Sequence, residues 1–220
     1  MRPGPLIRRL FGPYEHWAAE VFRGMFVNLD DFADLMKIWV PNAQRILEVG
    51  CGEGAMTERI TRRYPNASVT AIDITPRLGR LYRGDTSNVT FTQEYVEDVA
   101  RREPASFDLI VLADVLHHVP VDARPSLMNA IDQTIAPGGS FVFKEWAISS
   151  SPIDWICRGS DQYLSGDELS HLTPNGVEAF LTDTFGADAI RRIETVPPWK
   201  NNLVALVQRS AQSPAKDDRE

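Results

Sequence analysis

Short apolar runs alternate with amphipathic stretches from residue 45 to residue 209, and this alternation predicts the secondary structure. Runs rich in β-branched and aromatic residues predict strands at 45–49, 68–72, 89–92, 107–112, 140–146, 189–196 and 202–208. Helical spacing predicts helices at 55–64, from about 75 onward, at 123–135 and at 173–185. Strands that alternate with helices indicate an α/β fold, with a seven-stranded, mainly parallel sheet and helices on both faces.

Two segments fall outside this alternation. Residues 14–40 carry apolar and aromatic side chains at helical spacing, whereas residues 147–171 form a long irregular stretch of a length that is usually functional. The polar end, 210–220, is typical of a disordered tail. We therefore expect an N-terminal helical cap at 1–41 and one domain at 42–209.

Composition and charge narrow the range of partners. The 220 residues carry a formal net charge of −7, and no basic stripe with interleaved aromatic residues is visible. We therefore do not expect the protein to bind nucleic acid. Cys51 and Cys157 lie far apart, which favours free thiols in a reducing compartment. The start of the chain has no signal-peptide pattern and no apolar segment approaches the ~20 residues of a membrane span, so we expect a cytoplasmic protein.

A glycine-rich turn joins the first predicted strand to the first predicted helix. Residues 48–55 read Glu-Val-Gly-Cys-Gly-Glu-Gly-Ala. Glycines allow the backbone to pass close beneath a ligand, and the following helix offers free N–H groups. Gly50, Gly52 and Ala55 also satisfy the dinucleotide fingerprint, so the turn alone leaves the cofactor open.

Neighbouring residues decide between cofactors. Glu48 stands inside the strand where dinucleotide binders usually keep an apolar residue, and Asp73 ends the second strand in a position to hold ribose hydroxyls. With residues 107–119 (Phe-Asp to Leu-His-His-Val) and the Pro-Gly-Gly turn at 137–139, these features have the order and spacing of class I S-adenosylmethionine methyltransferases. The chain resembles this family over about residues 45–146, which implies a Rossmann-like domain, S-adenosyl-L-methionine as cofactor and a small-molecule acceptor.

The resemblance also implies which residues hold the cofactor. The floor under its methionine half would be formed by Glu48, Gly50, Cys51 and Gly52, with Cys51 acting through its backbone. Asp73 would bind the ribose, Ile74 would pack on the adenine, and Ala113 would offer its carbonyl to the amino group of the cofactor.

One position departs from the family pattern. Many relatives have a Gly-Asp-Ala-like step after the third strand, whose Asp contacts the adenine amine, but residues 93–98 here read Gln-Glu-Tyr-Val-Glu-Asp. Tyr95 aligns with that Asp. We expect that either Glu97 or Asp98 reaches the adenine, or that Val96 supplies backbone contacts only.

Candidate catalytic residues follow the fourth and fifth strands, where open α/β sheets bind ligands. They are Asp114, His117, His118 and Glu145. Methyl transfer needs alignment of the acceptor, exclusion of water and, for a hydroxyl, removal of a proton. Either histidine suits this last task, although one of the two could instead cap or pack. Asp114 and Glu145 could alternatively bind Mg²⁺, but so few oxygen ligands justify no metal assignment.

The two irregular segments supply the candidate acceptor pocket. We expect aromatic and acidic pocket residues at Trp146, Trp155, Tyr163, Asp154, Asp161 and Asp167, with core packing for Phe22, Phe26 and Trp39. His171 is expected on the surface, and His16 as a helix cap.

Three functions are compatible with these residues. The first is O-methylation of a small-molecule hydroxyl, with a saccharide slightly ahead of a phenolic or polyketide metabolite. The second is C- or N-methylation of a quinone-like or amine metabolite. The third is a catalytically inactive, cofactor-binding partner protein that acts through residues 14–40, whose apolar face could also form a homodimer.

Overall fold

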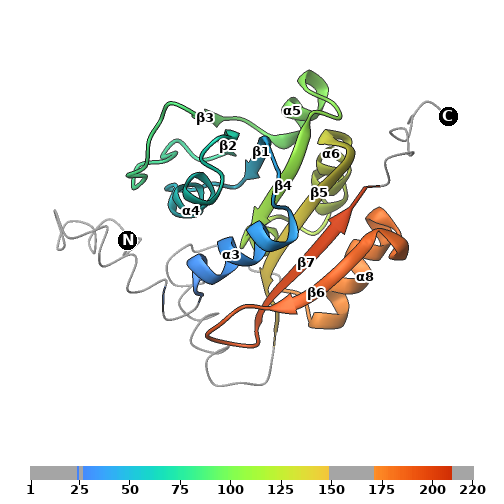
Figure 1. Ribbon diagram of the computed structural model, residues 1–220. Helices are drawn as coiled ribbons and strands as arrows, with labels where there is room; N and C mark the ends of the chain where they lie inside the picture. The colour runs from blue at the N-terminus through green and yellow to red at the C-terminus, as the bar shows by residue number, and fades with distance from the viewer. Residues whose placement is uncertain (1–23, 25–26, 149–170, 210–220) are drawn as a thin grey trace, which may run out of the picture.

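The computed structural model describes residues 24, 27–148 and 171–209, and its centre is a seven-stranded sheet (Figure 1). The strand order is β3-β2-β1-β4-β5-β7-β6. Strands β1 to β5 run parallel, whereas β7 is antiparallel to both neighbours. The strands are β1 (Arg45–Val49), β2 (Ser68–Asp73), β3 (Val89–Gln93), β4 (Phe107–Ala113), β5 (Ile135–Trp146), β6 (Ile190–Thr195) and β7 (Asn202–Gln208). The predicted Rossmann-like, mainly parallel sheet is confirmed.

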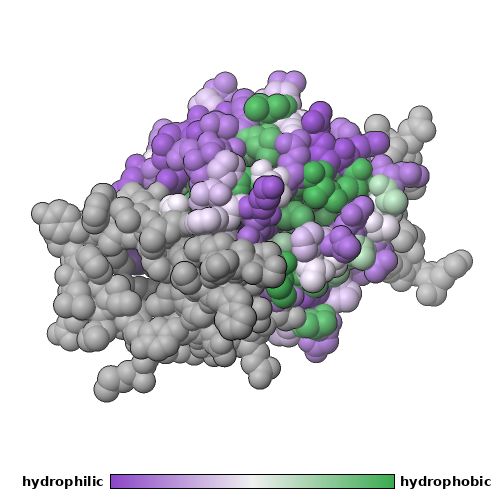
Figure 2. All heavy atoms as spheres, turned by 90° about the horizontal axis from the view of Figure 1, so that it is seen from below, coloured by the Kyte–Doolittle hydropathy of each residue, from purple (hydrophilic) through white to green (hydrophobic). Residues whose placement is uncertain are grey.

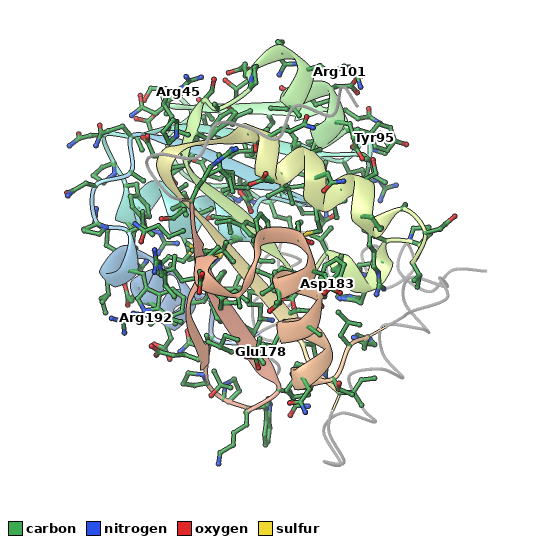
Figure 3. The ribbon with its side chains drawn as sticks, turned by 90° about the vertical axis from the view of Figure 1, so that its right-hand side faces the viewer. Arg45, Tyr95, Arg101, Glu178, Asp183 and Arg192 are labelled. Carbon is green, nitrogen blue, oxygen red and sulfur yellow. The ribbon has the colours of Figure 1, made fainter. Side chains whose placement is uncertain are left out.

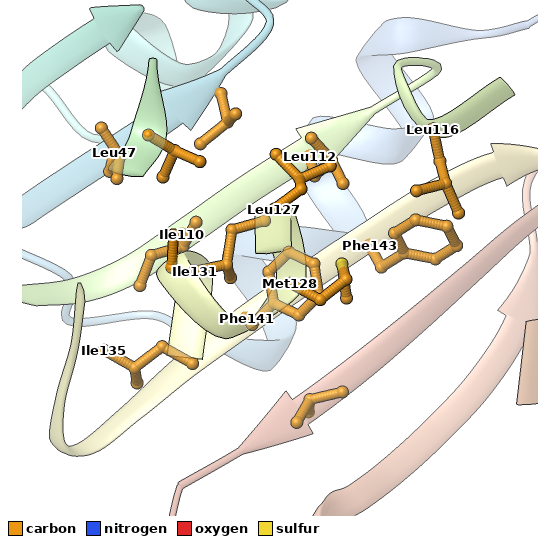
Figure 4. Close-up of a cluster of buried hydrophobic side chains, with 14 of the residues drawn as sticks. Leu47, Ile110, Leu112, Leu116, Leu127, Met128, Ile131, Ile135, Phe141 and Phe143 are labelled. Atoms are coloured by element: carbon orange, nitrogen blue, oxygen red, sulfur yellow. The ribbon is translucent and has the colours of Figure 1, made fainter. Parts of the chain in front are cut away.

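Helices cover both faces of the sheet. The helices are α3 (Leu29–Trp39), α4 (Ala55–Arg63), α5 (Val96–Arg102), α6 (Arg124–Thr134) and α8 (Pro174–Phe185). Successive strand residues point to opposite faces, so Ile46 packs with α3 and α4 while Leu47 packs with α5 and α6. Figure 4 shows the second of these cores, where Leu127 and Ile131 of α6 meet Ile110 of β4.

Helix α3 is part of this packing. Asn28 caps its N-terminus by accepting hydrogen bonds from the backbone N–H groups of Asp30 and Asp31. Its Phe32 and Met36 are fully buried, and Arg63 of α4 forms ion pairs with the acidic side of the helix. Trp39 is partly buried against the same core. Residues Phe22 and Phe26, for which core packing was also expected, lie outside the described residues, as does His16.

One predicted helix is absent from the structure, and one helix of the structure was not predicted. The helix expected from about residue 75 is wrong, because residues 74–88 form an irregular loop. In this loop the N–H groups of Gly79 and Leu81 donate to the carbonyls of Gly52 and Glu53, at 3.0 and 2.9 Å, instead of to an internal helix turn. Gly79 has a φ of +56°, which a right-handed helix does not accommodate. The sequence reading also missed α5, whose seven residues are too few for a clear periodic pattern.

The surface of the described residues carries both apolar and hydrophilic groups. No described helix combines the length and the apolar character needed to cross a bilayer. Where the face shown in Figure 2 is coloured, green apolar groups are interspersed with purple hydrophilic ones. The charged side chains labelled in Figure 3 are exposed and lie on the outside of the sheet and helices.

Candidate active site

The glycine-rich turn after β1 is folded onto the end of β2. The backbone N–H groups of Gly50 and Cys51 both donate to the carbonyl oxygen of Ile72, at 2.8 and 3.0 Å. The N–H of Gly52 donates to Oδ2 of Asp73 at 2.8 Å. These bonds hold the turn as a shallow floor at the carboxyl edge of the sheet, where open α/β folds bind their ligands.

Glycine is required at two positions of this floor for different reasons. Gly50 has a φ of +78°, and a Cβ added there would lie 2.3 Å from Cγ2 of Val115. Gly52 has a φ of +50°, but a Cβ added there would meet no atom within 4 Å. The first glycine therefore allows close packing against the segment after β4, whereas the second faces open space that a ligand can fill.

Asp73 is oriented by the turn. Its Oδ1 accepts from the N–H of Thr75 at 2.9 Å, while Oδ2 accepts from Gly52. Each carboxylate oxygen has two lone pairs, so both can still accept a hydrogen bond from a hydroxyl group. The next residue, Ile74, is 58% exposed and offers an apolar surface beside this carboxylate.

Glu48 is buried beneath the turn. Its side chain is 3% exposed, and among the described residues no group forms a hydrogen bond with its Oε2. Burial raises the pKa of Glu48 to about 7; the neighbouring Thr57 hydroxyl counteracts this, and the charge of Asp73 adds to it. A buried carboxylate oxygen of this kind points to a missing donor or cation above it.

Cys51 is also buried, and burial, together with the negative charge of Glu48, raises the pKa of its thiol. The thiol is therefore neutral and a poor nucleophile.

The segment after β3 shows how the departure from the family pattern is accommodated. Tyr95 is 60% exposed and precedes the first turn of α5 (Figure 3). Val96 is buried in the core. Glu97 accepts a hydrogen bond from the hydroxyl of Ser126 at 3.1 Å, and Asp98 pairs with Arg101. Both acids are thus engaged by helix neighbours.

A histidine and a glutamate meet at the carboxyl ends of β4 and β5. His117 lies in the 3-10 turn η2 (Leu116–His118), and its Nδ1 faces Oε1 of Glu145. The two side chains are 5% and 1% exposed. Burial by itself would raise the pKa of Glu145, but the charge and hydrogen bond of His117, with the Lys144 ammonium, hold that pKa below its ordinary value. Glu145 is therefore an anion that orients the His117 ring.

The other acidic candidate, Asp114, has a different partner. Both of its carboxylate oxygens accept from Nζ of Lys144 at 2.6 Å, and its N–H donates to the carbonyl of Lys144 at 2.9 Å. Because Lys144 and Glu145 are consecutive residues of β5, they point to opposite faces of the sheet. The structure therefore does not bring Asp114 and Glu145 together as the oxygen ligands of an Mg²⁺ ion.

The remaining histidines surround His117. The ring of His118, an exposed residue, lies 4.1 Å from that of His117 between centroids. The ring of His171 stacks on His117 at 4.7 Å and is half-buried. The expected surface position of His171 is therefore wrong. The N–H of Ile148 donates to the carbonyl of Leu172 at 2.9 Å, which ties this segment to the end of β5.

Of the expected pocket residues, only Trp146 is described, and it is buried at the end of β5. Trp155, Tyr163, Asp154, Asp161 and Asp167 lie outside the described residues. Ala113 ends β4 opposite Lys144, at the edge that carries the glycine turn.

Comparison with known proteins agrees with this geometry. Residues 46–139 match the family model of a methyltransferase domain. Over these residues the chain is similar to class I, Rossmann-like methyltransferases. It is 36% identical over 148 residues to the ubiquinone biosynthesis O-methyltransferase of Xanthomonas campestris pv. campestris, which corresponds to 66% of this chain and 57% of that protein. It is 28% identical over 166 residues to malonyl-[acyl-carrier protein] O-methyltransferase 1 of Ilyobacter polytropus, covering 69% of this chain and 60% of that protein.

The chain thus spans less than two thirds of the length of these curated relatives. A solved structure, the 1,6-didemethyltoxoflavin-N1-methyltransferase of Burkholderia thailandensis, has the same fold with a TM-score of 0.65 and 18% identity, over 94% of this chain and 88% of that chain. That enzyme was crystallised with S-adenosylhomocysteine and its acceptor.

The floor of the methyltransferase domain fits S-adenosylmethionine. A Cβ at Gly52 would meet no atom within 4 Å, Oε2 of Glu48 is buried without a hydrogen-bond partner among the described residues, and the carboxylate of Asp73 accepts from the N–H of Gly52, so the residues expected to hold this cofactor are compatible with it.

The sequence analysis missed two features of this candidate site, the side chain of Lys144 and the half-buried position of His171. Strand alternation around Glu145 could have placed Lys144 on the opposite face of the sheet. No local signal brings His171 to His117.

Proposed function

We propose that this methyltransferase transfers a methyl group to a hydroxyl of a small molecule, with a phenolic hydroxyl as the preferred acceptor and His117 as the base. The observation that carries this proposal is the buried pair of His117 and Glu145 beside the glycine turn. Val115, in the same segment as His117, packs against Gly50, so the pair adjoins the cofactor floor.

Each residue has a separate task in this mechanism. Glu48, Gly50, Gly52 and Asp73 would hold S-adenosylmethionine, which supplies an electrophilic methyl group when bound. Glu145 accepts from Nδ1 of His117 and fixes the tautomer whose Nε2 takes the acceptor proton. The negative charge of Glu145 then stabilises the imidazolium, as the carboxylate does in a Ser-His-Asp triad.

The strength of this base favours a phenol over a saccharide. A phenolic hydroxyl has a pKa of about 10, a few units above that of histidine, whereas a saccharide hydroxyl is far less acidic. The name of the Xanthomonas relative, an O-methyltransferase of ubiquinone biosynthesis, supports an acceptor with a hydroxylated ring. We therefore place the phenol ahead of the saccharide expected from the sequence.

The test is methyl transfer from labelled S-adenosylmethionine to matched acceptors. The panel contains a catechol, the corresponding aromatic amine, a quinone-like ring with an open carbon position and a glycoside, with the methylated atom identified by mass spectrometry and NMR. We expect O-methylation of the catechol. Transfer only to nitrogen or carbon would overturn the proposal, and cofactor binding without turnover on any acceptor would favour the inactive partner protein.

A further inference from the structure

Three potential metal ligands converge at the end of β5. They are His117, Glu145 and His171, and one donor atom from each lies within 4.8 Å of the others. His117 and Glu145 are buried and His171 is half-buried, with both of its ring nitrogens shielded from solvent. The three residues come from the turn after β4, from β5 and from the segment that leads into α8, so the fold itself brings them together.

An independent observation points to a missing ligand here. Oε1 of Glu145 faces His117 and accepts from the N–H of Trp146 at 3.2 Å, whereas Oε2 is buried and has no hydrogen-bond partner among the described residues. An anionic oxygen without a partner in the interior is costly, and it is compensated by a donor or a cation.

The donor set selects the kind of cation. Two imidazole nitrogens and one carboxylate suit a first-row transition ion, whereas Mg²⁺ and Ca²⁺ prefer oxygen ligands. Three protein ligands with the fourth coordination position left open are typical of catalytic zinc sites, whereas structural zinc sites have four protein ligands. With metal–ligand distances of about 2.0–2.2 Å, donor atoms of a tetrahedral ion lie roughly 3.4 Å apart. Nδ1 of His117 and Oε1 of Glu145, which are in hydrogen-bond contact, must therefore move apart to admit the ion, and His171 must approach, which a rotation of its ring out of its stack on His117 can provide.

We propose that His117, Glu145 and His171 bind one divalent transition-metal ion, with Zn²⁺ as the best match, and that the ion replaces the proton shared by His117 and Glu145. The displaced Nδ1 proton moves to Nε2 of the same ring, so one Zn²⁺ enters without a change of oxidation state. A consequence, which rests on the proposed function, is that Zn²⁺ inhibits methyl transfer because it occupies the base.

Metal binding can be measured without any acceptor. The full chain is treated with a chelator and dialysed against ZnCl₂, with metal content determined by elemental analysis and Co²⁺ absorption spectra used to report nitrogen coordination. We expect one equivalent of Zn²⁺. Glu145→Gln and His171→Asn should each bind at least about 10-fold more weakly. His118→Asn is the matched control, because it removes a neighbouring imidazole outside the donor set and should retain the metal.

Thermal unfolding of each variant checks that it is folded. The proposal is overturned if the wild-type chain takes up no stoichiometric Zn²⁺, or if His171→Asn binds it as tightly as wild type. The metal-site proposal and the proposed function can each fail while the other stands. Stoichiometric Zn²⁺ without inhibition would contradict His117 as the base and leave the metal site intact, whereas absent Zn²⁺ with an inactive His117→Asn variant would do the reverse.

Discussion

Nδ1 of His117 faces Oε1 of Glu145 across the ends of β4 and β5, although the two residues are separated by 28 positions in the sequence. Both side chains are almost completely buried. Removing one member of such a pair leaves the other without compensation in the interior, so conservative substitutions are the informative ones. The pair also distinguishes the two adjacent histidines, because His117 is buried against Glu145 whereas His118 is exposed.

The first prediction concerns the base. His117→Asn should lower kcat by roughly 10²- to 10⁴-fold, the usual contribution of a general base, while the affinity for S-adenosylmethionine stays near that of wild type. Steady-state kinetics on a phenolic acceptor and calorimetry check the two quantities. His118→Asn serves as the control and should have a much smaller effect. A reversed order of the two variants would assign the base to His118.

Glu145 should act through His117. Glu145→Gln retains an oxygen that can accept from Nδ1 but removes the negative charge that stabilises the imidazolium. We expect a lower kcat with little change in KM. In a double-mutant cycle with His117→Asn, the second substitution should cost little once the first is present. Fully additive losses would show that the two residues work independently.

The two glycines of the turn should respond differently to alanine. Gly50→Ala places a Cβ against Val115 and retains a positive φ, so it should lower the free energy of unfolding by roughly 2 to 4 kcal/mol. Gly52→Ala meets no neighbouring atom and should cost roughly 1 kcal/mol of stability, from the positive φ alone.

For cofactor affinity we expect the opposite ranking. Relative to the stability that each variant loses, Gly52→Ala should lose more affinity for the cofactor than Gly50→Ala. In Gly52→Ala the new methyl group occupies the space expected for the cofactor, so S-adenosylmethionine should bind at least about 10-fold more weakly. Urea unfolding and calorimetry on the two variants test both statements. Unchanged binding by Gly52→Ala would mean that the cofactor does not lie over this residue.

Asp73 should determine nucleoside binding. Asp73→Asn preserves the size of the side chain but removes the charge that would accept ribose hydroxyls, so we expect S-adenosylmethionine to bind roughly 10- to 100-fold more weakly. Asp183→Asn, at an exposed position of α8, is the control. Titration with NAD should show no binding to the wild-type chain, and tight binding of NAD would contradict the cofactor assignment.

Glu48 predicts a pH dependence of stability. Its pKa in the folded chain is about 7, against an ordinary value of 4.5, so between these values the folded state holds a proton that the unfolded state has lost. The free energy of unfolding should therefore fall as pH rises from about 4.5 to about 7, by roughly 3 kcal/mol from this group.

The comparison that isolates Glu48 is urea unfolding of the cofactor-free wild type and of Glu48→Gln across this pH range. The stability difference between the two should change with pH, with the wild type losing more as pH rises. If the difference stays constant, the carboxyl group is already ionised at the lower pH.

Local patterns were sufficient for most of the fold. Strands such as 107–112 are continuous apolar runs, and the glycines of the turn are the residues that accept a positive φ at a strand-to-helix junction. The helix expected from residue 75 failed because Thr75 and Pro76 have the local signature of a helix start, whereas Gly79 and Leu81 bond to the glycine turn, which is distant in sequence.

The sequence by itself determined the alternation of strands and helices, the cofactor turn and the position of Asp73, because these depend on periodicity and backbone conformation within a few residues. Only the tertiary structure decided which side chains meet at the proposed catalytic site. The register that places Ala113 opposite Lys144 sends Lys144 to Asp114 on one face of the sheet and Glu145 to His117 on the other. The hydrogen bond between the backbones of Ile148 and Leu172 brings the chain back to the end of β5, where the ring of His171 stacks on His117. Such pairings depend on strand register and on chain reversal, and no short stretch of sequence specifies either.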